Sequence, residues 1–301
     1  MHHDYDVLLL GGYFCDLIFT GLPEMPHLGA EVYGTGFDMV PGAAFTTAIA
    51  CRRLGLRVGW SCDFGDDFFS RFVLDAAQRE GLPADLFRLH PFPLRQVSVS
   101  MSFPHDRSFI SFAEPFDRPS PVPLIERHRP RAVLLSSLSY GDRHAALVEA
   151  AHGAGGLVYM DCQCNPATLE TPGVIEALRR VDIFAPNETE ALRLTGTPTL
   201  DAALDRLAAL TSLVIVKRGA AGALARSAGR EVRAPALSVA AFDTTGAGDC
   251  FNAGFLYGYL AGRPLEICLR CGNICGGLST TAHGGGGLPT AARVEEVLRD
   301  D

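Results

Sequence analysis

The sequence predicts a doubly wound α/β fold, and two features of its pattern carry that prediction. Short segments of continuous apolar residues recur along the chain, at 7–10, 133–135, 157–160, 183–184 and 213–216. Strands of this kind are covered on both faces of a parallel sheet. Segments with the apolar spacing of helices fill the gaps, at 42–54, 66–79, 144–152, 187–194 and 200–210. The alternation predicts a mostly parallel sheet flanked by helices.

Two segments depart from this rhythm and predict a second, smaller sheet. Residues 31–39 and 96–112 alternate polar and apolar side chains, with a turn at Pro104-His105-Asp106-Arg107 inside the second segment. Such alternation is typical of antiparallel strands with one exposed face. No long Gly/Ser-rich linker separates these segments from their surroundings. We therefore expect one domain over residues 1–301, with accessory lid strands drawn from about 13–39 and 95–113 that cover a cleft.

The composition excludes several classes of protein. The 301 residues are 48% hydrophobic and 20% charged, and 26 basic against 34 acidic residues give a net charge of −8. The chain thus lacks the basic surface that nucleic-acid binding requires. It shows neither a cationic leader nor a stretch approaching the roughly 18 apolar residues of a membrane span. We expect a cytoplasmic protein with neither nucleic acid nor membrane as partner.

The nine cysteines, an odd number, do not suit a disulfide framework. Cys268, Cys271 and Cys275 share one face of a predicted helix, and Cys162 and Cys164 flank Gln163 near a strand end. The favoured interpretation is that they are small core residues. A zinc or cluster site is the alternative, although no fourth ligand stands at a familiar spacing.

The segment from Asp243 to Phe255 reads Asp-Thr-Thr-Gly-Ala-Gly-Asp-Cys-Phe-Asn-Ala-Gly-Phe. Its Gly246-Ala247-Gly248 turn precedes an apolar helical run that begins at Cys250. Bare backbone N–H groups at a helix N-terminus form an anion site suited to a phosphoryl group. A carboxylate at Asp249 could accept the proton of an attacking hydroxyl there. A simple turn and helix cap would use the same residue types.

This thirteen-residue segment is similar to the C-terminal signature of the ribokinase-like, or PfkB, carbohydrate kinases. Further landmarks fall in that family's order: Gly11-Gly12 with Asp16, Gly42, Leu54-Gly55, Gly65-Asp66-Asp67, Asn187-x-x-Glu190 and Gly219-x-x-Gly222. The resemblance covers nearly the whole chain. It implies an ATP-dependent kinase with Mg²⁺ that phosphorylates a sugar hydroxyl. In many relatives a monovalent cation such as K⁺ is also bound.

The resemblance also implies roles for the residues of the glycine turn. Asp249 matches the catalytic base of the family, and the backbone of Gly246, Ala247 and Gly248 matches its anion hole. The loop that holds a monovalent cation in many relatives corresponds to Asp243 and Thr245.

On the nucleotide side, Asn187 and Glu190 match the element that organises Mg²⁺ and phosphate, often through water. A Glu three residues after an Asn is also ordinary helix capping. Gly219 and Gly222 match the loop beside the nucleotide.

Two further positions carry two readings each. Lys217, the only lysine in the chain, matches a position that faces the nucleotide phosphates, or is a plain strand-end charge. Asn273 corresponds to a helix that borders the adenine pocket, or is a buried structural residue.

The substrate side departs from the family pattern. Asp16 matches the carboxylate that accepts bonds from sugar hydroxyls in many relatives. The first helix is expected to open at Gly42, but Thr46 stands where a sugar-contacting Asn is usual. Residues 161–166 lack the Asp-x-Asn-x-Arg pattern of fructokinase and ketodeoxygluconate-kinase relatives and are closer to ribokinase. Arg107 could reach an acidic or phosphorylated substrate, or be an exposed turn residue.

Several functions remain open or are excluded. The favoured one is a sugar kinase. A nucleoside kinase, with Phe45 and Thr46 accommodating a base, and a non-catalytic sugar-binding homologue are the alternatives. No complete Gly-x-Gly-x-x-Gly follows the first strand, which excludes a nicotinamide dehydrogenase, and no Walker A motif is present. Because sheet edges are usually covered, we also expect a homodimer that pairs through the accessory sheet.

Overall fold

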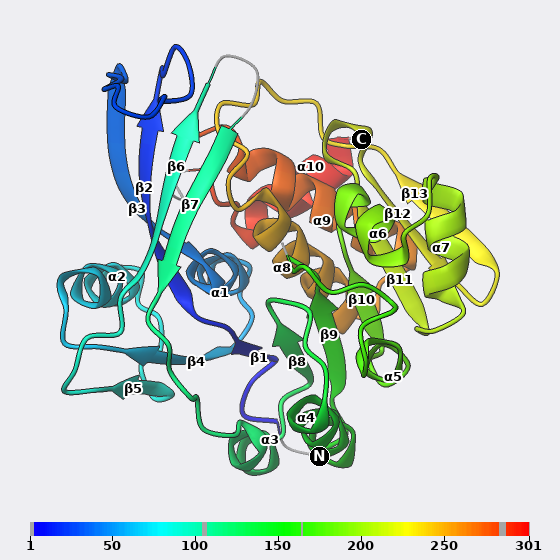
Figure 1. Ribbon diagram of the computed structural model, residues 1–301. Helices are drawn as coiled ribbons and strands as arrows, with labels where there is room; N and C mark the ends of the chain where they lie inside the picture. Colours follow the sequence, from blue (N-terminus) through cyan, green and yellow to red (C-terminus); the bar gives the residue numbers. More distant parts are fainter. Residues whose placement is uncertain (1–2, 104–106, 164, 283–286, 301) are drawn as a thin grey trace.

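The computed structural model describes residues 3–103, 107–163, 165–282 and 287–300. In this part of the chain a large sheet runs in the order β13-β12-β11-β10-β9-β8-β1-β4-β5 (Figure 1). Its strands are β1 (Val7–Leu10), β4 (Val58–Phe64), β5 (Phe87–Leu89), β8 (Ala132–Leu135), β9 (Leu157–Asp161), β10 (Ile183–Ala185), β11 (Leu213–Lys217), β12 (Ala223–Ser227) and β13 (Arg230–Ala234). Neighbouring strands are parallel from β11 to β5, whereas β12 and β13 are antiparallel.

The strand order reverses between β1 and β8. From β1 the chain proceeds to β4 and β5 on one side, and from β8 it proceeds through β9, β10 and β11 on the other. Crossover connections diverge at such a point and leave a crevice outside the carboxyl ends of the two strands, where ligands of open α/β sheets bind. The topology therefore places the expected binding region at the end of β1.

Helices cover both faces of the large sheet (Figure 1). Two separate clusters of buried side chains, one on each face, form the core. One cluster takes side chains from α1 (Ala44–Arg53), α2 (Phe68–Arg79), α8 (Ala247–Leu260), α9 (Leu265–Ser279) and α10 (Ala291–Asp300). The other takes them from α3 (Val122–His128), α4 (Asp142–Gly153), α5 (Val174–Leu178), α6 (Glu188–Thr195) and α7 (Leu200–Ala208). The predicted fold class is confirmed.

A small second sheet, with strand order β3-β2-β6-β7, stands beside the large one (Figure 1). It contains β2 (Tyr13–Thr20), β3 (Gly36–Ala43), β6 (Gln96–Ser102) and β7 (Arg107–Ala113). The strand expected at 31–39 begins only at Gly36. It also continues through Gly42, which pairs with Phe14 in β2 instead of opening the first helix. The predicted turn residues 104–106 lie outside the described residues.

The predicted cysteine-rich helix face packs in the core. Cys268, Cys271 and Cys275 of α9 are buried, as are the other cysteines that the structure describes. They face glycines of α8, and a Cβ atom built at Gly254 would lie 2.5 Å from the carbonyl oxygen of Cys271 and 2.6 Å from the Cys275 sulfur. The close approach of α8 and α9 therefore requires glycine at position 254. Among the described residues, no helix combines the length and hydropathy needed to cross a membrane.

We predict that Gly254→Ala lowers the free energy of unfolding by roughly 1–3 kcal/mol, because the added methyl group overpacks a backbone contact. This loss exceeds the gain in helix propensity, which is at most about 1 kcal/mol. The matched control is Gly153→Ala in α4, where a Cβ atom would meet no atom within 4 Å. Urea unfolding should show the control at or slightly above wild-type stability. Equal effects of the two substitutions would contradict the proposed packing constraint.

Candidate active site

The N-terminus of α8 lies at the centre of the candidate site. Gly246 precedes the helix in the left-handed region, with φ of 74°, which glycine adopts without strain. The amide of Ala247 donates to the carbonyl of Thr244 (3.3 Å). The amides of Gly248 and Asp249 have no acceptor among the described residues. They are the orphan donors of a helix start, and the helix dipole favours an anion beside them.

Asp249 lies in the first turn of α8. Its Oδ1 accepts a hydrogen bond from the Thr47 hydroxyl of α1 (3.0 Å). Burial, together with the nearby charge of Asp161, raises the pKa of Asp249 to about 7, although Lys217 and Thr47 act in the opposite direction. A carboxylate with this pKa is well matched to accepting a proton near neutral pH.

A cavity of about 80 Å³ lies on one side of Asp249. The predicted substrate residues Asp16, Gly42 and Thr46 line it, together with Asp243, Thr245 and Gly246. A Cβ atom at Gly42 would come within 2.1 Å of the Asp16 carboxylate, so any side chain there would displace it. Burial and the charge of Asp243 raise the pKa of Asp16 to about 6. The fold thus gathers carboxylates from β2 and from the loop before α8 around one small space.

A second cavity, of about 260 Å³, lies on the other side of the α8 N-terminus. Lys217, Gly219, Gly222, Gly248 and Asn273 line it. Its apolar wall consists of Ala236, Leu237, Val239 and Phe251. The Asn273 amide nitrogen donates to the carbonyls of Ala234 (3.0 Å) and Pro235 (2.8 Å). The side chain therefore fixes the segment after β13 and also borders the cavity.

Asn187 and Glu190 form a capping box at the start of α6. Asn187 Oδ1 accepts from the amide of Glu190, and Glu190 Oε2 accepts from the amide of Asn187, each at 2.8 Å. Burial, with the charge of Asp161, raises the pKa of Glu190. The structure thus contains the helix cap that the sequence pattern indicates, and the Glu190 carboxylate lies near Asp161.

Lys217 is held by a partner that the sequence did not indicate. Its ammonium group contacts both carboxylate oxygens of Asp161, at 2.8 and 2.7 Å. Only 12% of the lysine side chain and 6% of the aspartate side chain are exposed. Asn252 of α8 donates to the same carboxylate (2.5 Å). A Cβ atom at Gly248 would lie 3.5 Å from the Lys217 nitrogen, so the ammonium group also sits beside the free amides of α8.

Arg107 connects the accessory sheet to the glycine turn. It begins β7, and its guanidinium group donates to the Thr245 hydroxyl (2.8 Å) and lies 3.6 Å from the Asp243 carboxylate. The predicted substrate contact and the predicted cation loop are therefore in direct contact with each other.

We predict that Lys217→Met lowers the free energy of unfolding by roughly 3–5 kcal/mol, because it leaves a buried carboxylate without its counter-ion. Urea unfolding of the purified protein measures the loss. The double variant Lys217→Met with Asp161→Asn should recover part of the stability, since no buried charge then remains at this pair. A single variant as stable as wild type would show that the ion pair is unimportant for folding.

Comparison with known proteins gives matches over most of the chain. Residues 37–291 match the model of the pfkB family carbohydrate kinases. The ribokinase of Bacillus subtilis (strain 168) is 27% identical over 299 residues, which cover 97% of this chain and 99% of that protein. The fructokinase of Klebsiella pneumoniae is 31% identical over 265 residues, which cover 81% of this chain and 86% of that protein.

The fold agrees with these matches. The structure of Arabidopsis thaliana ribokinase complexed with ribose and ATP superimposes with a TM-score of 0.83 at 22% identity, covering 98% of this chain and 99% of that one. The prediction of a carbohydrate kinase is confirmed, and the chain belongs to the pfkB family of carbohydrate kinases.

Proposed function

We propose that this enzyme transfers the γ-phosphoryl group of ATP to a hydroxyl of a sugar or of a sugar-containing acceptor such as a nucleoside. The observation that carries this proposal is the position of Asp249. Its carboxylate, with a pKa raised to about 7, lines one cavity, and the neighbouring Gly248 lines the other. The amides of Gly248 and Asp249 have no acceptor in the part of the chain that the structure describes. One space suits an acceptor and the other a nucleotide.

In this mechanism the acceptor occupies the cavity lined by Asp16, and Asp16 and Thr46 bind its hydroxyls. Thr47 holds Asp249 Oδ1, so the second oxygen is left to receive the proton of the attacking hydroxyl. The free amides of Gly248 and Asp249 and the ammonium group of Lys217 face the phosphoryl group and stabilise its charge. The buried position of Asp249 keeps water away from the proton transfer.

ATP fits the second cavity because the apolar wall can hold a base while the Gly219–Gly222 loop allows close approach of the backbone. The structurally similar Arabidopsis thaliana ribokinase was solved in complex with ribose and ATP, which supports ATP as the phosphoryl donor. Mg²⁺ would be held on the side of Asn187 and Glu190, since it binds through one or two carboxylates together with phosphates. When bound, it neutralises charge on the phosphates. A monovalent cation such as K⁺ is proposed at the loop of Asp243 and Thr245, next to Arg107.

We further propose that residues 1–301 act as one domain in which the accessory sheet is a lid and pairs with its counterpart in a homodimer. The sheet exposes large apolar side chains, including Phe19, Phe37, Phe109, Ile110 and Phe112, and such patches mark interaction sites. We predict a dimer in sedimentation at micromolar concentration. A monomer with full activity would contradict an obligatory dimer.

We predict that Asp249→Asn removes most of kcat, by roughly 10²- to 10⁴-fold, because an amide preserves the shape but cannot accept a proton. Nucleotide affinity should change little. ADP release and nucleotide binding, measured on one preparation, check both points. Turnover close to wild type would remove Asp249 from its role as the base.

The raised pKa of Asp249 leads to two further expectations, one for the activity of the wild type and one for the stability of Asp249→Asn. In the wild type, kcat/KM should fall by roughly tenfold per pH unit below about 7, where the base becomes protonated. Because the folded carboxyl binds its proton more tightly than the unfolded one, ionisation lowers stability as the pH rises from the ordinary value of 3.8 through about 7. Asp249→Asn should therefore unfold at a higher temperature than wild type at pH 8.

A further inference from the structure

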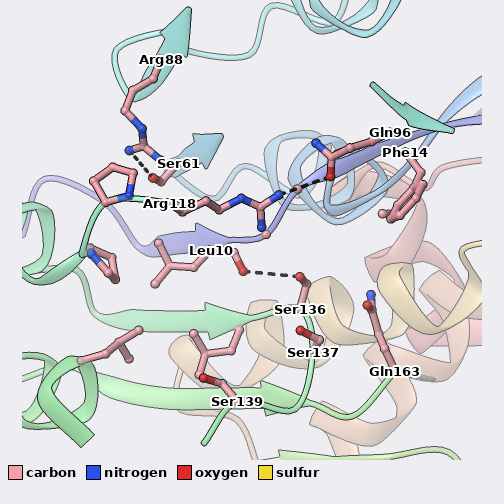
Figure 2. Close-up of a pocket in the computed structure, with 17 residues that line it drawn as sticks. Leu10, Phe14, Ser61, Arg88, Gln96, Arg118, Ser136, Ser137, Ser139 and Gln163 are labelled. Atoms are coloured by element: carbon pink, nitrogen blue, oxygen red, sulfur yellow. Dashed lines mark hydrogen bonds between the residues drawn. The ribbon is translucent and has the colours of Figure 1, made fainter. Parts of the chain in front are cut away.

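A cavity of about 340 Å³ at the strand-order reversal has no role in the reaction described above. The segments that follow β1 and β8, Gly11-Gly12 and Ser136–Ser139, form one side of it. The accessory sheet contributes Phe14 and Gln96, and the segment before α3 contributes Arg118 (Figure 2). The cavity thus occupies the crevice where the topology of an open sheet is expected to bind a ligand.

The lining of this cavity is polar and carries positive charge. Arg88 and Arg118 are its only charged residues among those the structure describes. Neutral polar groups complete it: Ser61, Gln96, Ser136, Ser137, Ser139 and Gln163. In Figure 2 the Arg118 side chain crosses the cavity, with Ser136, Ser137 and Gln163 on the opposite side. Guanidinium, amide and hydroxyl groups together are suited to binding carboxylate or phosphate oxygens.

One carboxylate serves both arginines. Asp63, of which 2% is exposed, accepts two hydrogen bonds from Arg88, at 2.7 and 2.8 Å, while Arg118 lies 3.9 Å away. Burial acts to raise the pKa of Asp63, but its bonds with Arg88 and His90 hold that pKa below the usual value, so the carboxylate is ionised. The bidentate pair neutralises Arg88. The charge of Arg118 is left without a close partner of its own.

The surroundings hold Arg118 in place while its donors stay available. Its Nη2 donates to Gln96 Oε1 (3.3 Å), and a Cβ atom at Gly12 would lie 2.6 Å from Nη2, so the guanidinium group lies close to the backbone at Gly12. A guanidinium group has five N–H donors. Among the described residues Arg118 uses one of them in a hydrogen bond, and 48% of its side chain is exposed. The remaining donors can reach a ligand.

This cavity adjoins the proposed acceptor site. Phe14 lines it, and Asp16, two residues further along the same face of β2, lines the acceptor cavity beside Asp249. Ala43 lines both cavities. Two residues of a strand span roughly 7 Å. The two cavities are therefore adjacent, and an acceptor held at Asp249 can extend from one into the other.

We propose that this cavity is the distal subsite for the phosphoryl acceptor and that it binds a carboxylate or phosphate group carried by the sugar. Arg118, oriented by Gln96 and Gly12, is then the residue that determines this specificity. The inference rests on the proposed kinase function and names the chemical class of its substrate. A neutral sugar or a nucleoside base would leave Arg118 with only the Asp63 carboxylate, which Arg88 already holds, whereas an anionic group forms charge-assisted hydrogen bonds with it.

The test compares acceptors in matched pairs, one neutral and one anionic: glucose with gluconate, and fructose with fructose 6-phosphate. Cytidine and adenosine are included as nucleosides. ADP release gives kcat/KM for each acceptor. We expect at least one anionic member to exceed its neutral partner by roughly tenfold or more, and the carboxylate and phosphate pairs show which group is used. A higher kcat/KM for every neutral sugar, or for a nucleoside, would overturn the proposal.

Variants then assign the preference to a residue. Arg118→Met should lower the anionic-to-neutral ratio of kcat/KM by roughly 10- to 100-fold, and Arg118→Lys should lower it less because it keeps the charge but not the planar fork. The matched control is Arg71→Met, an exposed arginine of α2 that pairs with Asp66, for which the ratio should not change. An equal loss for both members of a pair in Arg118→Met would also overturn the proposal.

Failure of the kinase function and failure of the subsite are distinguishable. If no acceptor releases ADP, the proposed function fails, and calorimetric binding of gluconate and fructose 6-phosphate still tests the cavity. Binding that Arg118→Met abolishes in a folded protein, judged by its thermal midpoint, supports the subsite. Equal binding in both proteins, or none at millimolar concentration, overturns it.

Discussion

The buried ion pair between Lys217 and Asp161 is the contact on which the geometry of the site depends. It joins the carboxyl ends of β11 and β9. Asn252 of α8 donates to the same Asp161 carboxylate and accepts from the Tyr159 hydroxyl (2.8 Å). The ends of β9 and β11 are thereby fixed to α8 at Asn252, about one helical turn after the amides of Gly248 and Asp249. The position of Asp249 follows from this network.

Charge is distributed unevenly along the cleft. Asp16, Asp243 and Asp249 gather on one side of the glycine turn. Burial, together with the charges of neighbouring carboxylates, raises the pKa of Asp16 and of Asp249. Ionised carboxylates in so small a space destabilise the folded state, which is a frequent property of catalytic sites. Beyond Ala43 the sign changes, because Arg88 and Arg118 share Asp63. Two neighbouring cavities that share Ala43 therefore present one acidic and one basic lining.

Local patterns allowed prediction of the features that depend on neighbours in the chain. The buried strands, the helix beginning near Gly246 and the polar alternation of β6 follow from residues within one element. The start of β3 at Gly36 and the placement of Gly42 in that strand depend on pairing with β2, which a single segment does not reveal. The contact between Lys217 and Asp161 spans 56 positions. The lining of the Arg118 cavity comes from seven strands, from the segments between elements and from α4, so no local sequence motif predicts it.

The ion pair with Asp161 also gives Lys217 a distinctive place in the chemistry of the chain. Since no other lysine exists in the chain, Lys217 holds the only side-chain primary amine, and this amine lines a cavity of the candidate active site with 12% of its side chain exposed. Acylating reagents that attack free amines meet an ammonium group held in an ion pair with Asp161. Covalent capture at this position would report each opening of the ion pair. A reagent bound covalently to Lys217 would therefore label a single side chain within the candidate active site.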